Sequence, residues 1–133
     1  MGEKMDEKMD EKMNDKHSVL NVDNLHVSFY TEEGQLNVVQ NLTFDIGAGE
    51  TVALVGESGC GKSVTALAIM GLLDDACTTQ GQILLNGQEL MGLSAIKRQQ
   101  IRGRHIGMIF QEPMTSLNPV FTIGNQIGEV LTH

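Results

Sequence analysis

Between residues 19 and 46 the chain alternates apolar and polar residues in two runs. In the first run Leu25 and Val27 alternate with polar neighbours, and the pattern resumes over 36–46 after the turn Thr31–Gly34. A period of two is typical of strands with one buried face. The pattern predicts two antiparallel strands, over 19–29 and 36–46. The apolar set of the second strand would be Val38, Leu42, Phe44 and Ile46.

After residue 50 the pattern changes to continuous apolar runs separated by glycine-rich turns. The runs 51–55 and 106–110 are short and bounded by turn residues, which favours strands. Residues 63–73 are apolar nearly all round, as expected for a helix inside a larger assembly. The remaining elements are expected to be a loop over 74–81, a strand over 83–85 with the turn Asn86-Gly87, a helix over 94–102 with Ser94 as N-cap, and a helix over 123–131. This order indicates an α/β domain with a small antiparallel β-subdomain.

Residues 1–18 form a separate charged tail in which the tetrad EKMD repeats from Glu3 to Asn14. A period of four places like charges at i and i+4, which disfavours a helix, and it does not match the 3.5-residue period of a coiled coil. The tail is expected to be a solvated, disordered extension. The alternative is a docking helix with one face of methionines.

Composition excludes several classes of function. At 133 residues the chain has room for one small domain or part of a larger one. A formal net charge of −8, with no Lys/Arg-rich run, argues against a nucleic acid partner. Two cysteines are too few for a disulfide framework and fit a reducing, cytosolic setting. The apolar run 64–73 is far shorter than the roughly 20 residues that cross a bilayer, so any membrane role would come through a partner.

The strongest chemical signal lies between the apolar runs 51–55 and 63–73. Residues 56–63 read GESGCGKS, which fits GxxxxGK[ST] in the predicted order strand, loop, helix. This is the Walker A phosphate-binding pattern. The glycines let the chain curl tightly, so that backbone N–H groups converge on a triphosphate, and the following helix points its positive end at the same place. An ordinary glycine-rich turn is the disfavoured alternative.

The residue types in this loop fit the chemistry of a nucleotide bound with Mg²⁺. Lys62 would reach the β- and γ-phosphate oxygens as a point charge. The Ser63 hydroxyl would ligate Mg²⁺, which keeps part of its water shell. The predicted nucleotide-binding set is Gly56, Glu57, Ser58, Gly59, Cys60, Gly61, Lys62, Ser63 and Val64.

Residues 56–73 and 106–131 carry two separated motifs in the order found in a known family. They read GESGCGKSVTALAIMGLL and IGMIFQEPMTSLNPVFTIGNQIGEVL. Together they closely resemble the ATP-binding subunits of ABC transporters, and among these the branch that imports dipeptides, oligopeptides, nickel or glutathione. The resemblance covers residues 19–131. It implies a P-loop NTPase fold of the ABC type, ATP and Mg²⁺ as ligands, and a peripheral position on the cytoplasmic face of the inner (plasma) membrane.

The resemblance also implies roles for individual residues. Gln111 matches the Q-loop glutamine, a catalytic residue that senses Mg²⁺ and the attacking water. The stretch Glu112 to Thr122 matches the segment that receives the coupling helix of the transmembrane permease subunit. Phe29 or Tyr30 falls where the family places an aromatic ring that stacks on adenine, and the spacing from Leu25 favours Phe29.

The sequence departs from the family pattern at two places. Cys60 occupies a position where relatives usually carry Ser, so nucleotide binding should survive there while thiol reagents are expected to block the site. The family pattern also continues with a signature loop resembling LSGGQ, a strand ending in Asp-Glu and a later histidine, none of which occurs before His133. Residues 19–133 are therefore expected to be the N-terminal part of an ABC nucleotide-binding domain. Its core sheet would be incomplete, and it would not hydrolyse ATP alone.

The family hydrolyses ATP between two such domains, so a second ATP-binding domain, identical or different, is an expected partner. Two other functions stay open. One is a non-catalytic nucleotide-binding or regulatory protein that ends naturally at residue 133. The other is a kinase or GTPase, which the absence of a guanine-reading Asn-Lys-x-Asp disfavours.

Overall fold

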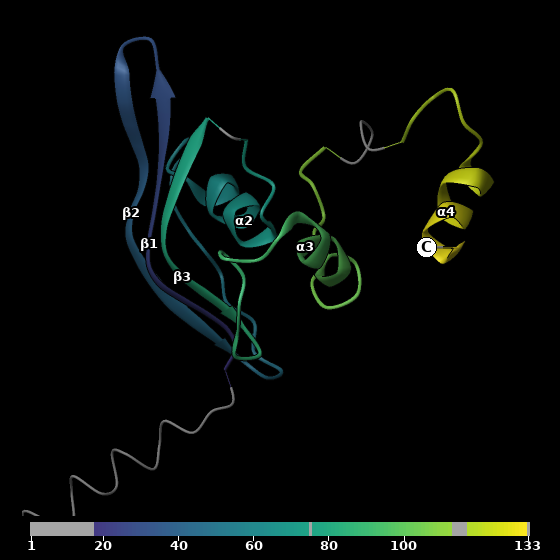
Figure 1. Cartoon of the computed structure of the whole chain (residues 1–133), viewed down its shortest axis with the longest axis horizontal. Coiled ribbons are helices and arrows are strands. Elements are labelled where there is room, and N and C mark those ends of the chain that lie inside the picture. The colour runs from purple at the N-terminus through teal and green to yellow at the C-terminus, as the bar shows by residue number, and fades with distance from the viewer. Residues whose placement is uncertain (1–17, 75, 113–116, 133) are drawn as a thin grey trace, which may run out of the picture.

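The computed structural model of the protein describes residues 18–74, 76–112 and 117–132. Its strands form one sheet in the order β2-β1-β3-β4, in which every neighbouring pair is antiparallel. One helix, α2, lies against a face of this sheet, with α3 next to it (Figure 1). In chain order the elements are β1 (Ser18–Thr31), β2 (Gly34–Gly47), α2 (Lys62–Met70), β3 (Cys77–Leu85), β4 (Gln88–Glu89), α3 (Ala95–Ile101) and α4 (Ile123–Thr132).

The two strands predicted over 19–29 and 36–46 are confirmed as β1 and β2, and each runs slightly further than predicted. They pair as a hairpin in which Thr31 stands opposite Gly34. The Thr31 hydroxyl donates a hydrogen bond of 2.8 Å to the carbonyl oxygen of Gly34, which closes the turn.

Irregularities in the β1–β2 ladder decide which side chains enter the core. Asn24 in β1 and Asn41 in β2 have positive φ angles of 49° and 52°. An extra residue at such a point shifts the alternation by one, so residues on either side of it face the same way. This is why both Val22 and Leu25 are fully buried. The predicted apolar set of the second strand is confirmed, since its members are partly buried and pack against the core, and Val39 is buried in addition.

The core lies between the sheet and the two helices α2 and α3. Partly buried side chains of α2, such as Val64, Ala68 and Ile69, pack against it. The buried apolar residues are Leu20, Val22, Leu25, Val27, Val39, Ile83, Leu85, Leu90 and Ile101.

Strand β3 is longer than the sequence pattern indicates. The prediction of a loop over 74–81 is wrong for residues 77–81, which pair with β1 from Phe29 opposite Cys77 onward. The predicted turn Asn86-Gly87 is confirmed between β3 and β4. Its φ angles of 49° and 78° are both positive, as the tight hairpin turn of this type requires.

Glu89 fastens the β3–β4 hairpin. One of its carboxylate oxygens, Oε1, accepts hydrogen bonds from the backbone N–H groups of Met91 at 3.0 Å and Ile83 at 3.3 Å. Burial raises the pKa of Glu89, but the hydrogen bonds from Met91 and Ile83 outweigh it, so the pKa lies below the ordinary value. The carboxylate is thus stabilised in its charged form.

The strands predicted over 51–55 and 106–110 do not form. Residues 51–57 and 107–110 belong to no helix or strand, and Val55 and Ile109 are 89% and 94% exposed. Within the described ranges, an isolated bridge between Arg102 and Ile106 is the one pairing of this region. A strand needs a hydrogen-bonded neighbour, and no described strand stands beside either segment. The prediction fails because pairing, rather than apolar composition, decides whether a strand forms.

Helix α2 begins at Lys62 and ends three residues earlier than the predicted 73. Gly71 follows it in the left-handed conformation, with φ 63°. The Gly71 N–H donates to Ala68 and the Leu72 N–H to Leu67, at 3.0 and 2.9 Å, which is the Schellman pattern of helix termination. This pattern satisfies two of the last four carbonyl groups.

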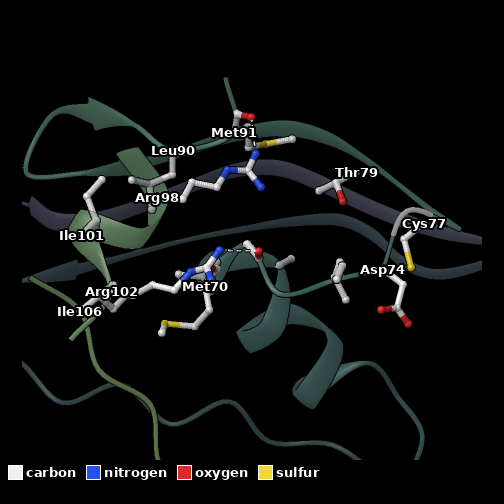
Figure 2. A pocket seen from close by; sticks show the side chains of 14 residues that line it. Met70, Asp74, Cys77, Thr79, Leu90, Met91, Arg98, Ile101, Arg102 and Ile106 are labelled. Atoms are coloured by element: carbon white, nitrogen blue, oxygen red, sulfur yellow. Dashed lines mark hydrogen bonds between the residues drawn. The ribbon is translucent and has the colours of Figure 1, made fainter. Parts of the chain in front are cut away.

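Arg102, which directly follows α3, covers more of the helix end. Its Nε donates to the Met70 carbonyl and its Nη2 to the Gly71 carbonyl, each at 3.0 Å (Figure 2). A cation is favourable at this position because the C-terminal end of a helix carries partial negative charge. One guanidinium group thus connects the end of α3 to the end of α2, although Arg102 and Met70 are 32 residues apart in the sequence.

Helices α3 and α4 match the predicted positions. Helix α3 starts directly after Ser94, whose side chain makes no capping hydrogen bond. The Thr122 hydroxyl accepts a hydrogen bond from Asn125 at the start of α4. The apolar side chains of α4 are exposed, and Figure 1 shows this helix apart from the sheet. Of the predicted tail, only Ser18 is among the described residues, where it begins β1. No described helix is long and apolar enough to span a membrane.

Replacing Arg102 by alanine should lower the free energy of unfolding by about 2 kcal/mol, because two hydrogen bonds from a charged group to helix-end carbonyls are lost. Lys97→Ala is the matched control: its side chain lies exposed on α3, the helix that Arg102 follows, and its removal should cost less than about 0.5 kcal/mol. Urea denaturation followed by circular dichroism measures both. Equal stabilities of the two variants would contradict the capping role.

Candidate phosphate-binding site

The glycine-rich segment 56–61 leads directly into α2, as the sequence predicts, although it follows an extended segment instead of a strand. Lys62 turns back over this segment. Its ammonium nitrogen donates to the carbonyl oxygens of Gly56 at 2.7 Å and Glu57 at 2.6 Å, and it lies 3.4 Å from the sulfur of Cys60. The loop is thus wrapped around the charge that would meet a phosphate group.

Gly61 allows the start of α2 to pack directly against the sheet. It has φ 93°, in the left-handed region, and a Cβ added there would lie 3.0 Å from both the Val38 carbonyl oxygen and a methyl group of Val39. The backbone of the loop therefore rests directly on β2. A side chain at this position would push the loop away from the strand.

Thr65 holds the first turn of the helix to the same glycine. The Thr65 N–H donates to the Gly61 carbonyl at 2.8 Å, and the Thr65 hydroxyl donates to the same oxygen at 2.9 Å. The side chain is only 3% exposed. Sequence reasoning missed this residue, although a threonine that can bond back to the carbonyl four residues earlier is a usable signal.

The open end of α2 presents hydrogen-bond donors. The N–H groups of Lys62, Ser63 and Val64 have no acceptor in the part of the chain that the structure describes. The first turn of α2 contains no acidic residue. The Ser63 hydroxyl makes no hydrogen bond within the described ranges either, and its side chain is exposed. Free N–H groups at a helix N-terminus, next to an ammonium group, fit an anionic ligand such as a phosphate.

Cys60 is exposed and lies inside the loop. Its sulfur approaches Gly56 so closely that a Cβ on that glycine would collide with it. The thiol thus lines the space enclosed by the loop. The predicted block of the site by thiol reagents depends on this position.

The two aromatic residues proposed for adenine stacking differ in exposure. Phe29 is partly buried and packs against the core, whereas the ring of Tyr30 is 62% exposed. Both lie on β1 beyond Val27, the partner of Val39, on which the loop rests. At about 3.3 Å per residue they are displaced by roughly 7 to 10 Å along the strand from that pair. Of the two rings, Tyr30 is the more accessible to a ligand.

Gln111, Glu112 and residues 117–122 belong to no strand. Gln111 is exposed and, among the described residues, makes no hydrogen bond with the phosphate loop. Residues 113–116 lie outside the described residues. Beyond them, Leu117, Val120 and Phe121 are exposed. The structure therefore brings together the loop residues but not Gln111 with them.

Comparison with known proteins identifies the family. Residues 39–130, more than two thirds of the chain, match the family described as ABC transporter.

The chain belongs to the ABC transporter family.

The match includes the phosphate loop, α2 and the segment around Gln111. This places the protein among P-loop ATPase domains, with a small antiparallel sheet in the part described.

Curated relatives within the ABC transporter family are similar over most of this chain. The dipeptide transport ATP-binding protein DppD of Bacillus subtilis (strain 168) is 54% identical over 115 residues, which are 85% of this chain and 34% of the relative. The oligopeptide transport ATP-binding protein OppD of the same organism is 48% identical, over 85% of this chain and 32% of its own length. The glutathione import ATP-binding protein GsiA of Escherichia coli O1:K1 / APEC is 50% identical, over 84% and 19%. The chain spans about a third or less of the length of these relatives.

Substitution of Gly59 and of Gly61 by alanine should separate backbone strain from steric contact. Gly59→Ala meets open space and should cost about 1–2 kcal/mol, because alanine is strained at φ 84°. Gly61→Ala should cost at least about 1 kcal/mol more, because its Cβ also presses on Val38 and Val39. Equilibrium unfolding in urea gives both values. If the Gly61→Ala variant is as stable as the Gly59→Ala variant, Gly61 does not pack tightly against β2.

Proposed function

We propose that this chain binds ATP, with Mg²⁺, as part of the energy-coupling subunit of an ABC importer for peptides or related small solutes. The single observation that carries the proposal is the loop at the start of α2, where the Lys62 ammonium group and the free N–H groups of Lys62, Ser63 and Val64 share one open end. The relatives' names supply the solute class: dipeptides, oligopeptides and glutathione.

In this proposal the glycines, Lys62 and Ser63 have separate roles. The N–H groups of Gly59, Gly61 and the first turn of α2 hold phosphate oxygens, and Lys62 exchanges the carbonyl groups of Gly56 and Glu57 for the β- and γ-phosphates. Ser63 supplies a hydroxyl oxygen to Mg²⁺. When bound, the metal neutralises phosphate charge and orients the triphosphate. Either Tyr30 or Phe29 stacks on adenine.

The same proposal places the protein in an assembly. Gln111 serves as the catalytic and metal-sensing glutamine, and residues 112–122 contact a transmembrane permease subunit. The exposed apolar side chains of Leu117, Val120 and Phe121 are suited to such a contact. A second ATP-binding domain, identical or different, completes the ATPase on the cytoplasmic face of the membrane. The named relatives favour this function over a regulatory nucleotide-binding protein, a kinase or a GTPase.

Calorimetric titration with Mg-ATP tests the proposal. The unsubstituted chain should bind one nucleotide, and Lys62→Ala should weaken binding by at least about tenfold, because a charge-assisted contact to phosphate is removed. Lys97→Ala, which removes an exposed positive charge outside the loop, should bind like the parent. Absence of binding by the parent chain, shown to be folded by circular dichroism, would refute the proposal.

Alkylation of Cys60 gives an independent test in a Cys77→Ser background. N-ethylmaleimide should react with the exposed Cys60 thiol, and saturating Mg-ATP should slow the reaction at least about tenfold, because the thiol lines the space inside the loop. The alkylated chain should no longer bind nucleotide, whereas Cys60→Ser should bind normally. An alkylated protein with unchanged affinity would place Cys60 outside the site.

A further inference from the structure

A cavity of about 310 Å³ lies at the opposite end of α2 from the phosphate loop. It opens between the end of α2, strand β3 and helix α3 (Figure 2). Helix α2 has nine residues, so the two ends are about 13 Å apart along its axis. The cavity is thus a separate space from the nucleotide site proposed above.

Aliphatic side chains form part of the cavity wall, beside charged and polar groups. Ala68, Ile69 and Leu73 line it on one side, and Leu90, Ile101 and Ile106 on the other. A volume of 310 Å³ corresponds to about ten water molecules in the liquid. This volume suits a ligand of about ten non-hydrogen atoms, at the lower end of the size range of small-molecule sites, with both a polar and an apolar part.

Two guanidinium groups lie in the same wall. Figure 2 shows Arg98 of α3, and Arg102 just after this helix, beside Met70 and Met91. Arg102 donates Nε and Nη2 to the carbonyl groups at the end of α2. Arg98 donates Nη2 to the Met91 carbonyl at 2.6 Å. Neither arginine has a carboxylate within ion-pair distance in the described part of the chain.

Arg98 keeps unused hydrogen-bonding capacity. Its Nε is buried without a partner and is closed off by packing, so a ligand could not reach it. Its Nη1 also has no hydrogen-bond partner among the described residues, but it is not closed off in this way. This nitrogen lies over Gly71, where a Cβ would come within 2.9 Å of it. A charged donor that faces a cavity with few other partners favours an anionic oxygen.

One carboxylate of the chain also lines the cavity. Asp74 lies beside Cys77, and Figure 2 shows these two residues at the end away from Arg98 and Arg102. A negatively charged ligand would therefore place its charge at the arginine end and its apolar part along the aliphatic wall. The two ends of the cavity thus define a direction for the ligand.

From these observations we infer that the cavity binds a carboxylate carried on an aliphatic chain of about six to eight carbon atoms. The carboxylate accepts hydrogen bonds from Nη1 of Arg98, and the chain fills the space between α2 and α3. This site goes beyond the proposed nucleotide function and does not depend on it.

Octanoate is the probe for this site, and Cys77 is a built-in reporter because its thiol lines the cavity. In a Cys60→Ser background, octanoate should bind saturably by calorimetry and should slow alkylation of Cys77 at least threefold. Octan-1-ol and acetate should each bind at least about tenfold more weakly, because one lacks the charge and the other lacks the apolar chain. Equal binding of octan-1-ol, or no protection of Cys77, would overturn the inference.

Variants locate the carboxylate and separate the two sites. Arg98→Gln should weaken octanoate binding about tenfold, while Arg104→Gln, an exposed arginine outside the cavity, should leave it unchanged. Lys62→Ala and saturating Mg-ATP should also leave octanoate binding unchanged. The result for the cavity is then independent of whether the proposed nucleotide site binds ATP. Should Arg98→Gln fail to fold, the comparison of octanoate with octan-1-ol on the unsubstituted chain decides. Displacement of octanoate by Mg-ATP would place the probe in the nucleotide site and refute the proposal.

Discussion

Helix α2 is held at both ends by parts of the chain that lie far from it in sequence, and the candidate site depends on this. At its start, Gly61 rests on Val38 and Val39 of β2, and Thr65 ties the first turn back to Gly61. At its end, Arg102 binds the carbonyl groups of Met70 and Gly71. The donors of the first turn therefore keep a fixed direction relative to the sheet. The shape of the phosphate loop thus follows from the packing of the β1–β2 hairpin beneath it.

The distribution of positive charge supports the same arrangement. Although the net charge of the whole chain is −8, the described residues carry their Lys and Arg side chains at only two places, Lys62 and the segment 97–104. Lys62 turns into the phosphate loop, while Arg98 and Arg102 turn inward to the end of α2. Positively charged side chains thus lie at both ends of α2 and have different roles. The charge at the start of α2 can bind a ligand, whereas the charge at its end accompanies hydrogen bonds to backbone carbonyl groups.

Two apolar segments in the described part of the chain lie outside the sheet. Residues 51–55 lead into the phosphate loop and residues 106–110 lead to Gln111, yet neither segment is a strand. Both carry backbone groups that a sheet would pair, and exposed apolar side chains that a core would bury. This chain covers about a third of the length of the two relatives from Bacillus subtilis. The relation of Gln111 to the phosphate loop therefore depends on how these two segments are paired.

The sequence by itself determined the elements whose stability is local. The alternation in β1 and β2, the turn Asn86-Gly87 and the Walker A spacing each express a constraint acting within a few residues, and each appears at its predicted place. Only the tertiary structure decided the features that depend on distant partners. The shift at Asn41 that buries Val39, the extension of β3 to Cys77, and the Arg102 cap arise from contacts between separate elements. The two unformed strands have the same physical reason: a short apolar run becomes a strand only where a neighbour accepts and donates its backbone hydrogen bonds.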